Sequence, residues 1–192
     1  MEVYLIVGLG NPGKAYEKTR HNIGFETVKL LAEMWGVAFS RQSKLKSYVA
    51  QKKSEERTIF LLMPDTYMNN SGIAVRAAMD YYKVPLENIL IVVDDVAIDF
   101  AEFRLRKDSG TGGHNGLKSI EEHLNTDAYA RLRFGVANNN CGDLADYVTA
   151  KFSQEEEKLL PELLKQAVYF IEKWLSCGLE KAMNEANVKK RG

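Results

Sequence analysis

The sequence predicts an α/β fold: one mixed, mostly parallel, twisted sheet with helices on both faces. Apolar runs rich in β-forming residues, each bounded by turn residues, occur at residues 3–7, 58–63 and 89–93. Amphipathic helical patterns lie between and after these runs, and such alternation is typical of a sheet covered on both faces. Because one hydrophobic core can serve a chain of 192 residues, we expect a single domain over residues 1–192.

Three helices are predicted from their apolar stripes. The first covers residues 25–35 and ends at Gly36; its stripe is Phe25, Val28, Leu31, Ala32 and Trp35. The second starts with Ser71 as N-cap and runs to about Lys83, with an inward stripe of Ile73, Ala77 and Tyr81. The third opens at the glycine-rich loop 110–116, and its apolar stripe is Leu117, Ile120 and Leu124.

Two short segments alternate apolar and basic side chains. Residues 103–106 (FRLR) and 131–134 (RLRF) have the period of two that is typical of a half-buried strand. We therefore expect their arginines to lie on the outer face of the sheet.

The C-terminal part is predicted to be helical. Ser153 and Glu156 have the spacing of a capping box, and Pro161 suits the first turn of a second helix. Gly178 is expected to end that helix, and residues 189–191 to form a solvated basic tail. The packing residues of the helix are predicted to be Phe170, Ile171 and Trp174.

The overall charge gives no sign of a nucleic-acid partner. Lys plus Arg and Asp plus Glu each number 26, so the formal net charge is zero and any RNA contact needs a local basic patch. Cys141 and Cys177 have no metal-ligand spacing and no disulfide pattern, which favours a reduced, cytoplasmic setting. The apolar run at residues 3–7 is too short for a signal sequence or a membrane span, so we expect no membrane association.

The first predicted strand leads into a G-x-G-x-x-G pattern at residues 8–13, the fingerprint of dinucleotide-binding proteins. That fingerprint requires a helix that begins within the glycines, whereas residues 14–24 are polar and poorly periodic. An acidic residue should also end the following strand, but the candidate at residues 37–39 leads into Ser40 and Arg41. This context argues against a nucleotide cofactor.

Polar side chains follow the apolar strands at the positions where each strand ends. Asn11 and His21 follow the first strand, residues 64–72 the second and Asp94 the third. Because the carboxyl ends of parallel strands meet at one edge, we expect a histidine, a carboxylate and several amides to converge there. Neutral histidine can take a proton from water, a carboxylate can fix its tautomer, and amides can stabilise an oxyanion.

Each of these residues also has a structural explanation, as a helix cap, a turn former or a strand end. Asp94 and Asp95 point to opposite faces, so at most one can serve His21. From the residues alone, the chain is either an α/β hydrolase or a ligand-binding domain.

Taken together and in order, these motifs resemble the bacterial-type peptidyl-tRNA hydrolase family. The matching segments are residues 7–13, Tyr16 with 19–25, 64–72, Asp94, 112–118 and 131–135. Two segments differ from the family pattern: residues 95–101 lack its usual glycine, and residues 136–141 replace its usual glycine-and-proline turn. We expect both to lie in loops.

The resemblance implies a role for each matching residue. The chain is expected to hydrolyse the ester between a peptide and the 3′-terminal ribose of tRNA, with His21 as base, Asp94 orienting it and Asn11 near the ester. Substrate is expected to contact Tyr16, Met68, Asn69, His114 and Asn115. The tRNA phosphates are expected to contact Arg104, Arg106 and Arg133. The family also implies a monomer with no metal and no organic cofactor. The main alternative is a non-catalytic RNA-binding protein on the same scaffold.

Overall fold

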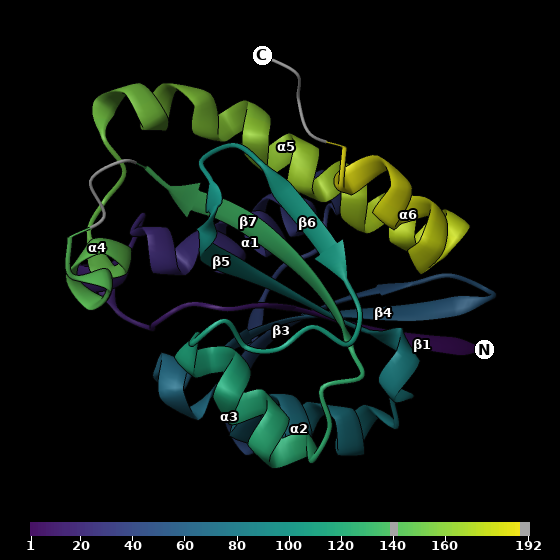
Figure 1. The fold of residues 1–192 in the computed structure, drawn as a ribbon. Coiled ribbons are helices and arrows are strands. Elements are labelled where there is room, and N and C mark those ends of the chain that lie inside the picture. The colour runs from purple at the N-terminus through teal and green to yellow at the C-terminus, as the bar shows by residue number, and fades with distance from the viewer. Residues whose placement is uncertain (139–141, 189–192) are drawn as a thin grey trace.

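The computed structural model describes residues 1–138 and 142–188. In this part of the chain, one mixed sheet has the strand order β2-β3-β4-β1-β5-β7-β6. The strands are β1 (Glu2–Gly8), β2 (Ser40–Gln42), β3 (Ser47–Lys53), β4 (Arg57–Pro64), β5 (Ile89–Asp99), β6 (Phe103–Arg106) and β7 (Ala130–Ala137). The predicted α/β fold with a mixed sheet is confirmed (Figure 1).

The middle of the sheet is parallel and its edges are antiparallel. Strands β4, β1, β5 and β7 run in the same direction, whereas β2, β3 and β6 run against their neighbours. The carboxyl ends of the four parallel strands therefore meet at one edge of the sheet. This arrangement brings the segments that follow β1 and β4 close to Asp94. The sequence predicted that Asp94 would follow its strand, but Asp94 lies within β5.

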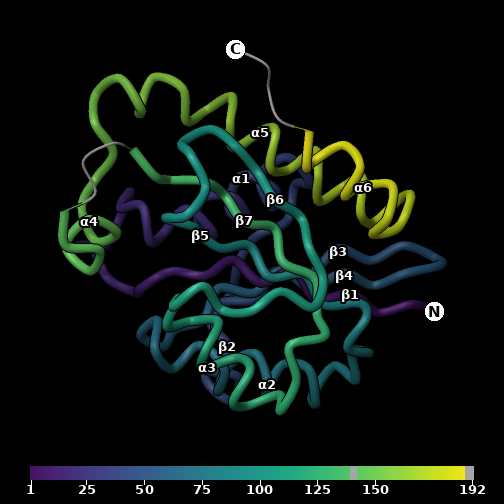
Figure 2. Tube along the Cα trace, viewed as in Figure 1, coloured from purple at the N-terminus to yellow at the C-terminus, as the bar shows by residue number. Residues whose placement is uncertain are grey.

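Helices cover both faces of the sheet (Figure 1). One face packs against α1 (Ile23–Trp35), α5 (Gln154–Cys177) and α6 (Leu179–Ala186), and the other against α2 (Ser71–Tyr82) and α3 (Asn115–Leu124). The short helix α4 (Leu144–Thr149) lies at the opposite end of the molecule from the start of β1 (Figure 2). No described helix combines the length and apolarity needed to cross a membrane.

Two of the predicted helices match the structure closely. In α1 the predicted stripe packs into the core, and the helix ends at Gly36 in the left-handed conformation with φ 66°. In α3 the predicted stripe is also buried. The second prediction is right in extent but wrong in detail, since Asn70 is the N-cap of α2 and Tyr81 is 67% exposed. The buried face of α2 consists of Ser71, Gly72, Ala74, Val75 and Ala78.

The C-terminal helices differ from the prediction at one residue. Ser153 and Glu156 form the predicted capping box, and Gly178 ends α5. Pro161 lies inside α5 and starts no new helix. It costs the helix the backbone bond to the carbonyl of Glu157, but Glu157 is exposed and water can satisfy that carbonyl. A further helix, α6, follows Gly178 and was not predicted from the sequence.

The prediction that arginines face outward from the two strands with alternating apolar and basic residues is right for β6 and wrong for β7. In β6, Phe103 and Leu105 are buried and Arg106 is exposed, as expected. In β7 the prediction is wrong, because Arg131 is fully buried and Arg133 is only 9% exposed. An ion pair with Glu121 of α3 at 3.0 Å compensates the charge of Arg131, so a basic residue can face the covered side of the sheet.

The predicted loop at residues 95–101 is also largely strand. β5 continues to Asp99, with a register irregularity between Asp95 and Asp99. Residues 37–39 form no strand, since β2 starts at Ser40. Cys177 has a free, exposed thiol, while Cys141 and the basic tail lie outside the described residues.

The glycines of the G-x-G-x-x-G pattern allow α1 to approach the end of β1. A Cβ on Gly8 would lie 2.2 Å from the carbonyl oxygen of Gly24, and one on Gly10 would lie 2.7 Å from the ring of Phe25. Helix α1 starts only at Ile23, well beyond the glycines. Gly8 and Gly10 therefore serve packing between strand and helix, and no α-helix begins within the glycines as a dinucleotide fingerprint requires.

Candidate active site

His21 and Asp94 meet at the carboxyl edge of the sheet. His21 lies in the 3-10 turn η2 (Arg20–Asn22) before α1, and Asp94 lies in β5. The Nδ1 atom of His21 is 3.0 Å from both carboxylate oxygens of Asp94. The two residues are 8% and 3% exposed. Because Asp94 accepts a hydrogen bond from Nδ1, the neutral ring carries its proton there and Nε2 keeps a free lone pair.

A second histidine contacts the same carboxylate. The Nε2 atom of His114 lies 3.0 Å from Oδ1 of Asp94. Its Nδ1 accepts from the backbone N–H groups of Gly116 at 3.1 Å and Leu117 at 3.4 Å, which makes His114 the N-cap of α3. A nitrogen that accepts from amides carries no proton, so Nε2 must be the donor to Asp94. The neutral tautomers of the two histidines are therefore opposite.

These contacts keep Asp94 ionised. Burial alone raises the pKa of this carboxyl group, but His114 and His21 lower it by charge and by hydrogen bonds. The net result is a pKa well below the ordinary value of aspartate. Asp95 is directed elsewhere and forms an ion pair with Arg133 at 2.8 Å. Only one of the two aspartates faces His21, as predicted.

Asn11 is held in a single orientation. Its side-chain oxygen accepts from the backbone N–H of Met68 at 2.7 Å. Its backbone N–H donates to the side chain of Asn22 at 2.8 Å, and its backbone oxygen accepts from the same side chain at 3.0 Å. Because the oxygen of the Asn11 amide is occupied, the amide N–H₂ is the group left to donate. Asn22, next to His21 in the chain, supports Asn11, a role that was not predicted from the sequence.

A cavity of about 260 Å³ opens beside the histidines. His21, Asp94 and His114 form part of its lining, together with the loop at residues 111–113, Asn115 and Arg133. Helix α4 supplies an apolar wall of Leu144, Ala145 and Val148. This wall was not predicted from the sequence, because a helix of six residues is too short for its apolar residues to establish a helical period. A base and an oriented carboxylate beside a cavity suit acyl transfer to water.

The chain is similar over its whole length to one family of enzymes. A family model described as peptidyl-tRNA hydrolase matches residues 5–192. The peptidyl-tRNA hydrolase of Gloeobacter violaceus is 43% identical, with 100% of this chain and 98% of that protein covered. That of Cytophaga hutchinsonii is 46% identical over 97% of this chain and 99% of that protein. The chain belongs to the peptidyl-tRNA hydrolase family.

A solved structure supports the same assignment. The crystal structure of peptidyl-tRNA hydrolase from Acinetobacter baumannii matches with a TM-score of 0.90 and 33% sequence identity, covering 98% of this chain and 96% of that chain. The fold described above is thus the fold of a peptidyl-tRNA hydrolase.

The structure places Asn11 and the residues that the family resemblance assigns to substrate as follows. His114 and Asn115 line the cavity beside His21. Asn11 borders a neighbouring cavity of about 300 Å³, which Asn22 also lines. Met68 is buried and holds Asn11, whereas Asn69 is exposed on the 3-10 turn η4 (Met68–Asn70). Tyr16 is partly exposed and packs edge-on against Tyr67, with ring centroids 6.3 Å apart.

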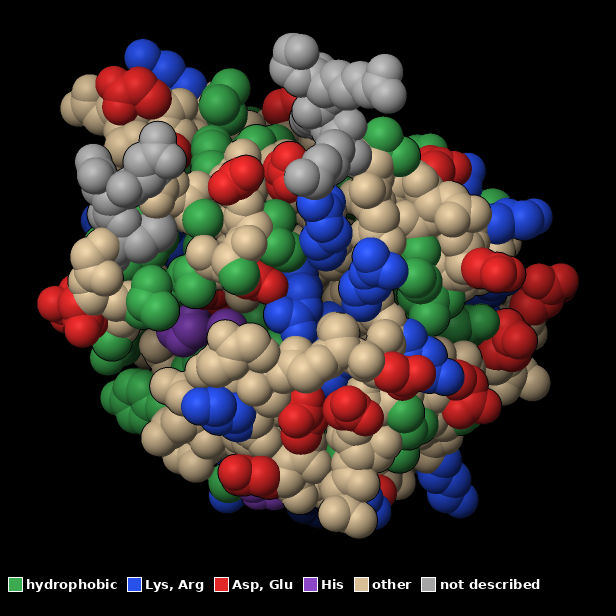
Figure 3. Space-filling model, viewed as in Figure 1, with side chains coloured by type: hydrophobic (Ala, Val, Ile, Leu, Met, Phe, Trp, Pro, Cys, Tyr) green, Lys and Arg blue, Asp and Glu red, His purple; other side chains and the backbone are tan. Residues whose placement is uncertain are grey.

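The three arginines assigned to tRNA differ in their freedom to bind a phosphate. Arg133 pairs with Asp95 and donates to Ser109 and to the carbonyl of Gly110, so its guanidinium is engaged within the protein. Arg104 pairs with Glu102 at 3.1 Å. Arg106 is exposed. In Figure 3, basic side chains gather over β6 at the centre of the face shown, beside the histidines.

Histidine and aspartate side chains can also bind transition metals, and the site contains three of them: His21, Asp94 and His114. One candidate ligand atom from each lies within 4.8 Å of the others. In the arrangement described above, both histidine nitrogens that face Asp94 carry protons, and a metal ion would have to displace both. Mutual hydrogen bonding accounts for the cluster, and the expectation of metal-independent activity stays a prediction.

Proposed function

We propose that this chain hydrolyses the ester bond between the C-terminal carbonyl of a peptide and the 3′-terminal ribose of tRNA, releasing peptide and free tRNA. Membership of the peptidyl-tRNA hydrolase family supports this activity. The observation that carries the mechanism is the 3.0 Å contact between His21 Nδ1 and Asp94, with His21 at the wall of the cavity. We further propose that the chain acts in the cytoplasm, as one domain and as a monomer.

In this mechanism His21 is the general base. Its Nε2 takes a proton from water while the water oxygen forms a bond to the ester carbonyl carbon. Asp94 stabilises the imidazolium that results and keeps the ring in its productive tautomer. The tetrahedral intermediate collapses when the bond from carbon to ribose oxygen breaks. That oxygen takes up one proton and leaves as a hydroxyl group, and the imidazolium of His21 gives up one proton, which restores the neutral base.

Three asparagines are assigned to the substrate. The N–H₂ group of Asn11, fixed by the contact between its oxygen and Met68, donates to the carbonyl oxygen as that oxygen gains charge. Asn69 assists in positioning the carbonyl, and Asn115 binds the substrate beside His21. Tyr16 and Met68 are also assigned to the substrate side; Met68 is buried and acts there through the orientation of Asn11. Arg104, Arg106 and Arg133 are assigned to the tRNA side, with Arg106 the most accessible.

The test is release of peptide from an N-blocked peptidyl-tRNA by the purified protein, with a chelator present. Turnover with the chelator present would support a hydrolase that needs no metal ion. An absence of turnover, with tRNA still bound in a salt-sensitive manner, would favour a non-catalytic RNA-binding protein. A titration with NAD(H) that shows tight binding would instead favour the nucleotide-cofactor interpretation of residues 8–13.

A further inference from the structure

Arg20, the residue before His21, is a charged side chain inside the protein. It is 5% exposed, and its Nη2 atom lies 2.7 Å from Oε2 of Glu156, the capping residue in the first turn of α5. The side chains of this ion pair are 6% and 9% exposed. A buried charge without a partner is strongly unfavourable, so each of these residues requires the other.

Further contacts of Arg20 reach the segment between α4 and α5. Its Nη1 donates to the carbonyl of Lys151 at 2.7 Å, and its backbone N–H donates to that of Ala150 at 3.1 Å. The guanidinium lies 4.2 Å from the centroid of the Tyr147 ring and 5.2 Å from that of Phe152. One side chain thus ties the turn that carries His21 to the end of α4 and the start of α5.

Glu156 joins the same elements from the other side. Its Oε2 accepts from the backbone N–H of Ser153 at 2.8 Å, as part of the capping box. Its Oε1 accepts from the side chain of Asn138, just after β7, at 3.4 Å. Helix α4, which this network holds, supplies Leu144, Ala145 and Val148 to the cavity wall. The pair of Arg20 and Glu156 therefore holds both the turn with His21, the proposed base, and the cavity wall that α4 supplies.

We propose that Arg20 and Glu156 form a positioning pair, which fixes His21 relative to Asp94 and to the wall that α4 contributes. This proposal rests on the proposed hydrolase function and adds two residues to it. Neither residue lines the cavity, so both act through the residues that they hold. The competing explanation is that the pair only stabilises the first turn of α5.

The first test compares Glu156→Gln with Ser153→Ala. Glu156→Gln keeps an oxygen for the N–H of Ser153 but removes the charge that Arg20 needs. We expect kcat for peptidyl-tRNA to fall about 10- to 100-fold with KM within about twofold, because small misplacements of a base are costly. Ser153→Ala weakens the cap of α5 and leaves the ion pair intact, so its kcat should stay near that of the wild type. Equal losses of kcat in both variants would overturn the proposal.

The second test removes both charges. Buried ion pairs can be replaced by apolar residues of similar size without loss of folding, so the double variant Arg20→Met with Glu156→Leu should keep a melting temperature near that of the wild type. We expect its kcat to remain at least about 10-fold low. Recovery of kcat together with stability would show that the pair is only structural.

A readout that needs no turnover separates this proposal from the proposed function. The chain has three histidines, so their ring nitrogens can be assigned by NMR with single substitutions. In the wild type, His21 should carry its proton on Nδ1 and His114 on Nε2. In the double variant, the Nδ1–H signal of His21 should broaden or shift while that of His114 is unchanged. An unchanged His21 signal would overturn the positioning role, whether or not the wild type hydrolyses peptidyl-tRNA.

Discussion

At the scale of single residues, the site depends on one carboxylate that serves two imidazoles. Asp94 accepts from Nδ1 of His21 and from Nε2 of His114, each at 3.0 Å. His114 cannot reverse its tautomer without losing two backbone N–H groups at the start of α3. The carboxylate is thereby fixed by His114 on one side and orients the ring of His21 on the other.

The substitution Asp94→Asn should slow turnover without weakening tRNA binding. An amide can donate to His21 Nδ1 and so favours the wrong tautomer, which in other His–Asp systems costs about 10⁴ in kcat. Here we expect a loss on the order of 10²–10⁴. Single-turnover rates and tRNA dissociation constants measured side by side check this; weaker tRNA binding with an unchanged rate would place Asp94 in recognition.

The lowered pKa of Asp94 has a consequence for stability against acid. The folded state binds the proton of this carboxyl group more weakly than the unfolded state, whose pKa is about 3.9. The stabilisation is therefore fully present above about pH 4 and is lost as the pH falls through the lower, folded pKa. Melting temperatures of the wild type and Asp94→Asn should converge as the pH drops below about 4. A constant difference from pH 7 to pH 3 would contradict this account.

At the scale of elements, the site depends on how closely α1 approaches β1. A Cβ on Gly24 would lie 2.4 Å from the backbone N of Leu9 and from the backbone O of Val92. Neither neighbour is a flexible side chain, so the backbone itself would have to move. This approach places the turn with His21 beside Asp94, which lies in the middle of β5.

Gly24→Ala should therefore lower the free energy of unfolding by about 3 kcal/mol, the upper end of the usual cost of overpacking a core. Gly110→Ala is the matched control, because a Cβ there would meet nothing within 4 Å. Its effect should stay within about 0.5 kcal/mol. Urea unfolding of both variants measures the difference, and equal stabilities would show that α1 can move away from β1 at little cost.

Apolar periodicity correctly predicted the elements whose buried residues are the apolar residues of their own sequence pattern. The stripe of α1, the stripe of α3 and the buried strands all agree with the structure, because each helix stripe packs on one face of the sheet and the buried strands contribute to the core on both faces. The arginines of β7 do not, since Arg131 is buried with an ion-pair partner on another element, Glu121 of α3. Pro161 was misassigned because the loss of one exposed hydrogen bond is tolerated in a helix of 24 residues. The candidate site was predictable in its residues, but the contacts of His114, Asn22 and Arg20 depend on tertiary structure.

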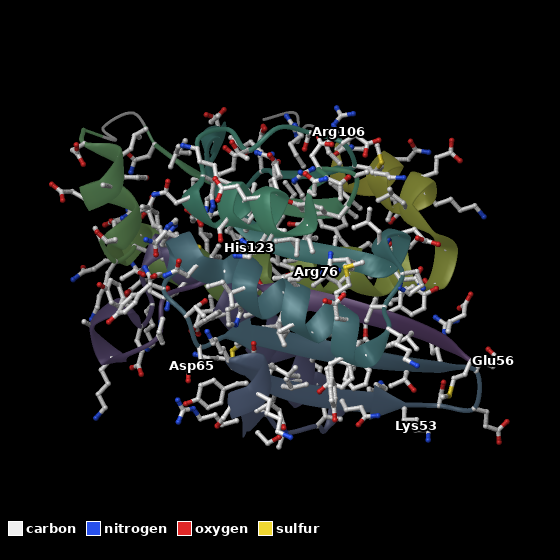
Figure 4. The ribbon with its side chains drawn as sticks, turned by 90° about the horizontal axis from the view of Figure 1, so that it is seen from below. Lys53, Glu56, Asp65, Arg76, Arg106 and His123 are labelled. Carbon is white, nitrogen blue, oxygen red and sulfur yellow. The ribbon has the colours of Figure 1, made fainter. Side chains whose placement is uncertain are left out.

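At the scale of the whole molecule, the formal net charge is zero, so binding of tRNA, a polyanion, requires a local basic patch. β6 is the edge strand of the sheet and carries Arg104 and Arg106. Figure 4 shows Arg106 at the margin of the molecule, while Arg76 lies on α2, which faces the viewer. Arg133, which pairs with Asp95, connects the cavity to the glycine-rich loop beside this strand.

Arg106→Gln should weaken tRNA binding and reduce its salt dependence. Loss of one phosphate contact lowers the slope of log K against log salt concentration by about 0.7–0.9. Arg76→Gln removes an arginine on α2 that pairs with Asp80, and we expect it to leave the slope unchanged. Binding titrations over a range of salt concentrations check both, and equal slopes in all three proteins would exclude β6 as the tRNA surface.

The most direct test of the central claim is the turnover of His21→Ala against that of His123→Ala on N-blocked peptidyl-tRNA. His123 is exposed on α3 and contacts the carbonyl of Ser119 away from the cavity. We predict that His21→Ala remains folded and loses about 10²–10⁴ in kcat, the usual worth of general-base assistance. We predict wild-type turnover for His123→Ala. Near-normal turnover by His21→Ala would contradict the assignment of His21 as the base.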